Sequence, residues 1–155
     1  MNKIIFTITF SFFTVCALNG CGFKTAKQAE INLVQINMDG DKRITNKIKN
    51  TILINFKDEN KKKYILDLNV KKIKKVKEKK NNKIVKYELI LQINGSIKKL
   101  GSTKSRNFSI EKASEFSVNS SHYLTKKSEQ DTLKNLIEVN IEEIINRVNL
   151  ETNRD

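Results

Sequence analysis

Residues 85–95 read VKYELILQING, and this stretch decides the fold. Apolar side chains occupy every second position in it: Val85, Tyr87, Leu89, Leu91 and Ile93. Successive side chains of a β-strand point to opposite faces, so the alternation predicts a strand with one buried face. The sheet that contains this strand is therefore expected to be covered on one side and open on the other.

The strand is followed by Asn94-Gly95, a pair that favours the positive φ angles of tight hairpin turns. A two-residue loop would set Ile93 against Ser96, whereas a three-residue loop would set it against Ile97, so the register stays open. Either loop predicts a fourth strand over residues 96–108, which is polar enough to lie at an edge or against a partner.

Upstream, residues 64–71 also alternate, and the apolar face changes phase near Ile73 and Val76, which predicts a β-bulge. Asn81-Asn82 then predicts a turn into the strand at 85–93. Residues 30–36 alternate weakly and predict a buried first strand.

Two helices are predicted from apolar residues at helical spacing. The first follows the turn and cap at Asp39-Gly40-Asp41, and its stripe is Ile44, Ile48, Ile52 and Phe56. The second begins at a Ser128 cap, and its stripe is Leu133, Ile137, Ile141, Ile144 and Val148, with Leu136 and Ile145 beside it. Residues 111–126, rich in Ser, Asn and charge, are interpreted as a long loop.

The predicted order is β-α-β-β-β-α, with the last three strands antiparallel. It indicates an α+β fold, a two-layer sandwich in which a four-stranded sheet carries both helices on one face. The domain is placed at residues 30–150, with a frayed tail at 151–155.

The first residues predict export. A charged start, a short apolar run from Ile4 to Leu18 and small residues before Cys21 are the parts of a secretion signal, assigned to residues 1–20. Leu18-Asn19-Gly20-Cys21 sharpens it into a lipobox, so Cys21 is the predicted lipidation site, followed by an arm over residues 21–29. A retained transmembrane anchor is the alternative, disfavoured because the run falls short of about 20 residues. Gly22 indicates the outer membrane, since Asp often stands there in lipoproteins retained in the inner membrane.

The formal net charge is +13, or +12 once Lys3 leaves with the signal, so an anionic partner is expected. Much of the charge lies between Lys61 and Lys86. Acidic lipid, phosphorylated glycolipid and nucleic acid all fit the charge, but export and the lack of interleaved aromatic residues argue against nucleic acid. An AT-rich genome would also raise the content of Lys, Asn and Ile, which accounts for part of the excess.

Nothing in the sequence indicates catalysis. His122 is the only histidine, so neither a histidine cluster for a metal nor a pair of catalytic histidines can form. Cys16 leaves with the signal and Cys21 is consumed by lipid, so no disulfide is expected. We therefore expect no enzyme activity, no metal and no cofactor besides the covalent lipid on Cys21.

Four motifs resemble the lipopolysaccharide-assembly lipoprotein LptE family over nearly the whole mature chain. They are Cys21-Gly22-Phe23-Lys24, Ile44-Thr45-x-x-Ile48-Lys49-Asn50-x-Ile52, Tyr87-x-Leu89-x-Leu91 and Leu124-x-Lys126-x-x-Glu129-Gln130-Asp131. The segment after Lys24 departs from the family by lacking the Pro or Arg residues often found there.

The resemblance implies a non-enzymatic outer-membrane lipoprotein that plugs the lumen of the large LptD β-barrel and assists lipopolysaccharide insertion. The family's basic lipopolysaccharide contacts, in the turn between the second and third strands and before the last helix, correspond here to Lys80 and Lys126. The rival interpretation is an unrelated periplasmic lipoprotein whose basic face binds peptidoglycan or acidic lipid.

Overall fold

The computed structural model describes residues 31–56 and 59–154. The elements in order are β1 (Ile31–Gly40), α2 (Lys42–Asn55), β2 (Lys62–Lys80), β3 (Lys83–Lys99), β4 (Ser105–Ser117) and α3 (His122–Thr152). This order and the α+β class confirm the predicted fold. The predicted signal at 1–20, the arm at 21–29 and Cys21 lie outside the described residues.

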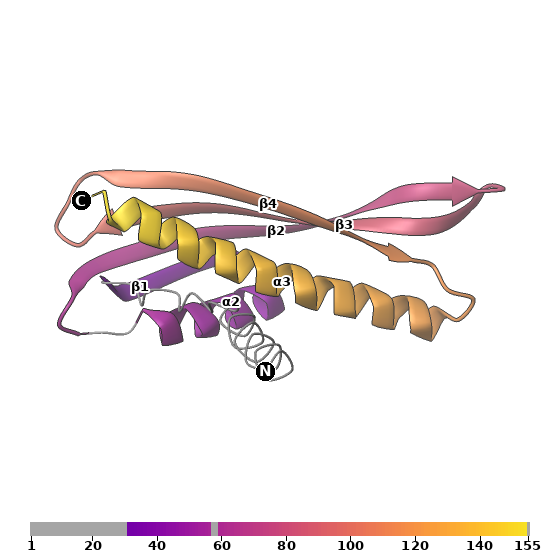
Figure 1. Ribbon diagram of the computed structural model, residues 1–155, viewed down its shortest axis with the longest axis horizontal. Helices are drawn as coiled ribbons and strands as arrows, with labels where there is room; N and C mark the ends of the chain where they lie inside the picture. The colour runs from indigo at the N-terminus through magenta and orange to yellow at the C-terminus, as the bar shows by residue number, and fades with distance from the viewer. Residues whose placement is uncertain (1–30, 57–58, 155) are drawn as a thin grey trace, which may run out of the picture.

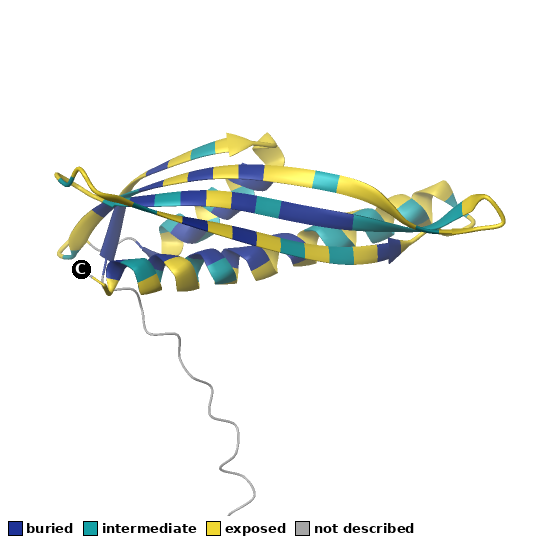
Figure 2. Cartoon of the chain, turned by 90° about the horizontal axis from the view of Figure 1, so that it is seen from above, coloured by how far each residue is buried: buried dark blue, intermediate teal, exposed yellow. Residues whose placement is uncertain are grey.

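The sheet is mixed, with spatial order β1-β2-β3-β4. β1 runs parallel to β2, and the other neighbours are antiparallel. α2 forms the crossover that a parallel pair requires, whereas turns suffice for the antiparallel strands. Both helices cover the same face of the sheet, and the other face is open (Figures 1 and 2).

The start of α2 shows why the chain turns where it does. Gly40 has φ of 123°, and a Cβ there would lie 2.1 Å from the carbonyl oxygen of Val70 on the neighbouring strand, so only glycine fits. Asp41 then caps the helix, because its carboxylate accepts a hydrogen bond from the backbone N–H of Arg43 at 2.9 Å. The predicted turn and cap are confirmed.

A large hydrophobic core and a smaller one beside it fill the space between the sheet and the helices. The predicted α2 stripe is fully buried, and so is the α3 stripe except for the half-buried Leu133. The most deeply buried strand residues, all 2% exposed or less, are Tyr64, Leu66, Leu89, Leu91 and Ile93. The helix-facing side of the sheet is thus the apolar side of the alternating strands.

The hairpin predicted at Asn94-Gly95 is wrong. Both residues lie inside β3, which continues to Lys99, and the chain turns over residues 100–104 instead. Glycine is required at position 95 by packing, because a Cβ there would lie 2.2 Å from the ring of Phe108 on β4. A glycine inside a strand can mark such a close approach as well as a turn.

Because β3 is longer than predicted, the elements that follow it also differ from their predicted ranges. The fourth strand spans Ser105–Ser117 and not residues 96–108, so the predicted loop at 111–126 is largely strand and helix. α3 begins at His122 with Ser121 at its N-cap, not at Ser128. Its first turns are stabilised by polar contacts, such as the 3.1 Å bond from the Thr125 hydroxyl to the Ser121 carbonyl, which apolar periodicity cannot detect.

The C-terminal end of α3 also extends past the predicted domain end at residue 150. Thr152 is 6% exposed, and Arg106 of β4 donates a hydrogen bond to the carbonyl of Glu151. In the described ranges, neither helix contains a stretch long and apolar enough to cross a membrane.

The fit of Phe108 over Gly95 gives a prediction about stability. Gly95→Ala should lower the free energy of unfolding by about 1–3 kcal/mol, because the added methyl overpacks the ring. Phe108→Leu in the same chain should recover part of the loss by vacating that space. Urea unfolding of the two single variants and the double variant measures the coupling, and purely additive losses would contradict the packing explanation.

Candidate functional site

Beyond the core, β2 and β3 extend as a long hairpin toward one end of the molecule (Figure 1). β1 makes its last pair with β2 at Val70, and β4 makes its last pair with β3 at Lys86; we call residues 71–86, which run between these two points around the turn, the basic finger. It contains a single acidic residue, Glu78, and nine lysines: Lys71, Lys72, Lys74, Lys75, Lys77, Lys79, Lys80, Lys83 and Lys86.

The tip of the finger is the predicted Asn81-Asn82 turn. Both asparagines have positive φ, 48° and 60°, as a tight two-residue hairpin turn requires. The predicted bulge is also present, as register shifts on either side of Glu78. Lys80, a predicted lipopolysaccharide contact, pairs with Lys83 across the turn; its side chain is 72% exposed and lies 3.4 Å from Glu78. It is an exposed cation at the tip of the hairpin and not part of a pocket.

Lys126, the other predicted contact, belongs to a more ordered arrangement at the base of the finger. Its ammonium lies 3.4 Å from Oε2 of Glu129, one helical turn later in α3. The ammonium of Lys74, from β2, lies 2.8 Å from the same oxygen. One carboxylate oxygen therefore holds two lysines from elements far apart in the sequence, which we call the lysine pair.

Aromatic rings fix the position of Lys74. Its ammonium lies 4.3 Å from the centroid of the Tyr87 ring and 5.0 Å from that of Phe116. The two rings stack at 5.5 Å and belong to a small second core that includes Leu89 and Leu136. Cation–π attraction and packing thus hold the charge in place where a surface lysine would sample many rotamers.

The lysine pair also determines the charge of Glu129, whose side chain is 17% exposed. Burial alone would raise the pKa of this carboxyl, but hydrogen bonds and the charges of Lys74 and Lys126 outweigh it, so the pKa is lowered from its ordinary value of 4.5. Glu129 is therefore ionised at neutral pH, and it occupies the place between the lysines that an anionic ligand oxygen would take.

The two predicted contacts lie at the same end of the molecule, but the structure does not bring them together. Lys80 is six residues beyond Lys74 on β2, about 20 Å further along the strand. Sequence reasoning missed Lys74 and Glu129. A usable signal existed: Lys74 is an even-numbered residue on the strand whose buried face carries Leu66, Leu68 and Val70, so it faces the helices.

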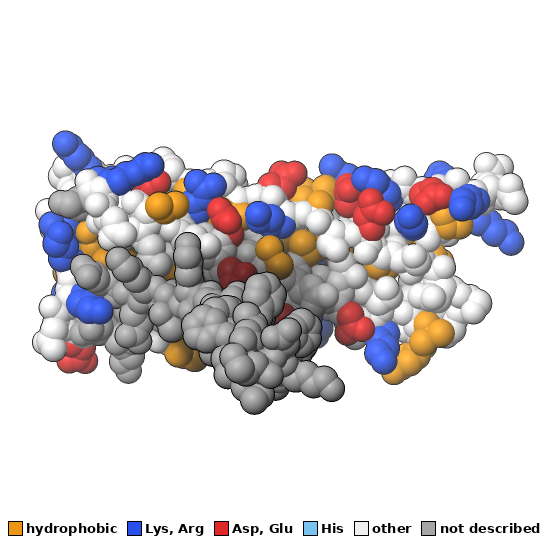
Figure 3. Space-filling view, in the orientation of Figure 1, with side chains coloured by type: hydrophobic (Ala, Val, Ile, Leu, Met, Phe, Trp, Pro, Cys, Tyr) orange, Lys and Arg blue, Asp and Glu red, His pale blue; other side chains and the backbone are white. Residues whose placement is uncertain are grey.

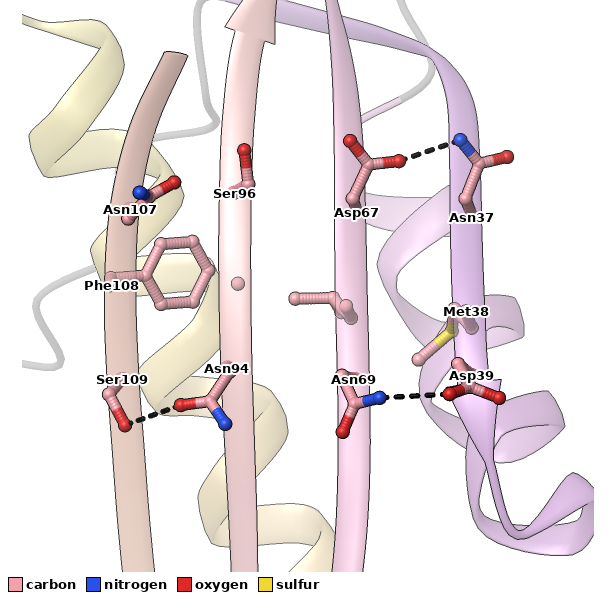
Figure 4. Close-up of a pocket in the computed structure, with 12 residues that line it drawn as sticks. Asn37, Met38, Asp39, Asp67, Asn69, Asn94, Ser96, Asn107, Phe108 and Ser109 are labelled. Carbon is pink, nitrogen blue, oxygen red and sulfur yellow. Dashed lines mark hydrogen bonds between the residues drawn. The ribbon is translucent and has the colours of Figure 1, made fainter.

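A second surface feature lies on the open face of the sheet. Short polar side chains from all four strands line a depression of about 800 Å³: Asn37, Asp39, Asp67, Asn69, Asn94, Ser96, Asn107 and Ser109. Three hydrogen bonds cross between strands: Asn37 to Asp67 at 2.6 Å, Asn69 to Asp39 at 2.9 Å and Ser109 to Asn94 at 2.9 Å (Figure 4). No cation lines this depression, so it does not suit an anionic ligand.

Neither His122 nor the acidic residues of the described ranges form part of a metal site. His122 is exposed at the start of α3. Within residues 31–56 and 59–154, no three His, Cys, Asp or Glu side chains converge as a metal site would require.

This fold is similar to that of two solved lipoprotein structures. A rare lipoprotein B from Shewanella oneidensis has a TM-score of 0.56 at 15% identity, covering 76% of this chain and 98% of its own. A minor lipoprotein from Acinetobacter baumannii has a TM-score of 0.62 at 10% identity, covering 79% and 93%. No family model and no curated protein matches the sequence. At these identities the likeness shows the fold alone.

The ionised Glu129 gives a pH-dependent prediction. Because its pKa is lower when folded than unfolded, it adds stability above about pH 4.5 that is lost as the pH falls through the folded value. Glu129→Gln should therefore be less stable than the parent at pH 7, by under about 1 kcal/mol, and equally stable in more acidic solution. Thermal unfolding across that range measures this, and a pH-independent difference would contradict it.

Proposed function

We propose that this chain is a non-enzymatic, LptE-like outer-membrane lipoprotein, acylated at Cys21, that occupies the lumen of an LptD-type barrel and assists lipopolysaccharide insertion. The observation that carries the proposal is the lysine pair, because it places a prepared cationic site at the end of the fold where the family resemblance expects the glycolipid. The fold shared with two lipoproteins supports the anchored part of the proposal.

The direction of β2 fits this role, because the start of the domain and the tip of the finger lie at its opposite ends. Ile31, the first described residue, pairs with Lys62, whereas the tip of the finger is at the other end of β2. These two ends of β2 are about 60 Å apart at the usual strand rise. A chain anchored through its N-terminal residues would therefore carry its cations well away from the start of the domain.

The finger carries more positive charge than Glu78 and the neighbouring carboxylates neutralise. Lys77 is bound to Glu88 at 2.8 Å and Glu115 at 3.4 Å, and these two carboxylates raise its pKa. Other lysines of the finger form no ion pair with any described residue: Lys71, Lys72, Lys75, Lys79 and Lys83. Such a surface attracts phosphate groups, and the ordered pair at its base positions two ammonium groups for one phosphate.

Removing one charge from the pair tests the ligand. Lys126→Gln should weaken binding of purified lipopolysaccharide about tenfold, the loss that about 1.4 kcal/mol produces. Lys80→Gln should have a smaller effect, since its lysine neighbours can substitute. Titration at two salt concentrations measures both, and the affinity should fall as salt rises.

Lys134→Gln is the matched control, because it removes the same charge from an exposed position on the same helix. It should change the affinity less than about twofold if the site is local. Equal losses for Lys126→Gln and Lys134→Gln would mean that net charge alone attracts the glycolipid.

The barrel partner is tested separately. A C-terminally tagged chain, extracted from the outer membrane in mild detergent, should retain a large β-barrel protein in stoichiometric amount. Recovery of the lipoprotein alone, or with peptidoglycan, would reject the plug role and favour the rival of a free-standing binding domain.

A further inference from the structure

Exposed apolar side chains gather where α3 begins. Nine large apolar side chains are exposed in the described part of the chain, and four of them belong to this end: Val76 (46%), Val118 (37%), Tyr123 (71%) and Leu124 (47%). We call these four the apolar end patch. The other five are spread along the molecule, in β1, α2, the turn after β3, and the middle and end of α3.

Backbone and side-chain contacts bring the patch together. The N–H of Val118 donates to the carbonyl of Val85 on the finger at 2.9 Å. The N–H of Asn119 donates to the Thr125 hydroxyl, also at 2.9 Å, and so ties the loop to the first turn of α3. Val118 is one of these bonded residues and Leu124 directly precedes Thr125, so the contacts tie the loop to the finger on one side and to the start of α3 on the other.

Cations border this surface. Lys126 and Lys127 follow Leu124 in α3, and the finger with its lysines lies alongside. Figure 3 shows hydrophobic side chains with Lys or Arg beside them at the end of the molecule where α3 begins. Isolated exposed apolar side chains are ordinary on protein surfaces, but a group of them flanked by cations matches an anionic amphiphile in both of its parts.

We propose that the apolar end patch contacts the acyl chains of an anionic lipid while the neighbouring lysines bind its headgroup. The proposal rests on the proposed function for the lysine pair and extends it from the phosphate to the hydrocarbon. Tyr123 suits the boundary, because its ring is apolar and its hydroxyl stays hydrated, and lysines near an interface keep their ammonium groups in the polar layer. An apolar protein partner would leave the flanking cations without a counter-charge.

The absence of tryptophan from the sequence permits a direct test. Tyr123→Trp in the acylated full chain introduces a single reporter at the patch. The protein is reconstituted into vesicles of phosphatidylglycerol or of phosphatidylcholine. We expect the indole emission to shift to the blue, and to be quenched by lipids with brominated acyl chains, in the anionic vesicles only.

Ile54→Trp is the matched control, because Ile54 is 82% exposed on α2 and lies outside the patch. Its emission should stay that of a hydrated indole in both vesicles, even though the same anchor holds the protein there. Adding Leu124→Ser to Tyr123→Trp should reduce the bromine quenching several-fold, since part of the apolar surface is removed.

The outcomes separate this inference from the proposed function. A hydrated Tyr123→Trp indole in anionic vesicles would overturn the acyl-chain contact, and so would quenching equal to that of Ile54→Trp. If Lys126→Gln nevertheless weakens lipopolysaccharide binding, the headgroup site stands without the patch. Quenching in both kinds of vesicle would reject the role of the cations.

Discussion

The pairing of β2 with β3 is the constraint on which the rest of the structure depends. Their register runs from Tyr64 opposite Lys99 to Lys80 opposite Lys83, so it covers both the core and the finger. β1 and β4 each add to one side of this hairpin, and both helices pack against the face that its alternation makes apolar. Because side chains alternate with a period of two, a shift by one residue would move the apolar set to the open face and separate Lys74 from Glu129.

The two strands of the finger are supported at its base by neighbouring elements. A two-stranded ribbon is marginal by itself in water. β4 continues beside β3 as far as the pair of Lys86 and Ser117, and α3 adds the contact from Glu129 to Lys74. The turn end past this point has no neighbouring strand among the described elements, so its lysines are exposed, whereas Lys74 is held by Glu129 and two aromatic rings.

Charge is distributed unequally over the molecule. The depression on the open face presents short amides, hydroxyls and two carboxylates, while the finger and the start of α3 present ammonium groups. The carboxylate of Glu129 offsets the repulsion within the lysine pair and holds both ammonium groups within 3.4 Å of one oxygen. A phosphate that displaces this carboxylate would meet two donors already ordered, which reduces the entropy lost on binding.

The sequence by itself determined the elements whose signal is local: the β3 alternation, the α2 stripe with its Asp41 cap, and the Asn81-Asn82 turn. Period and turn chemistry operate within a few residues, so they can be read directly. Only the tertiary structure decided the meaning of Asn94-Gly95, because the reason for its glycine is a ring on another strand, at Phe108. The same holds for Lys74 and Glu129, which are 55 residues apart in the chain. Their pairing follows from how α3 crosses the sheet, and no spacing in the sequence encodes that.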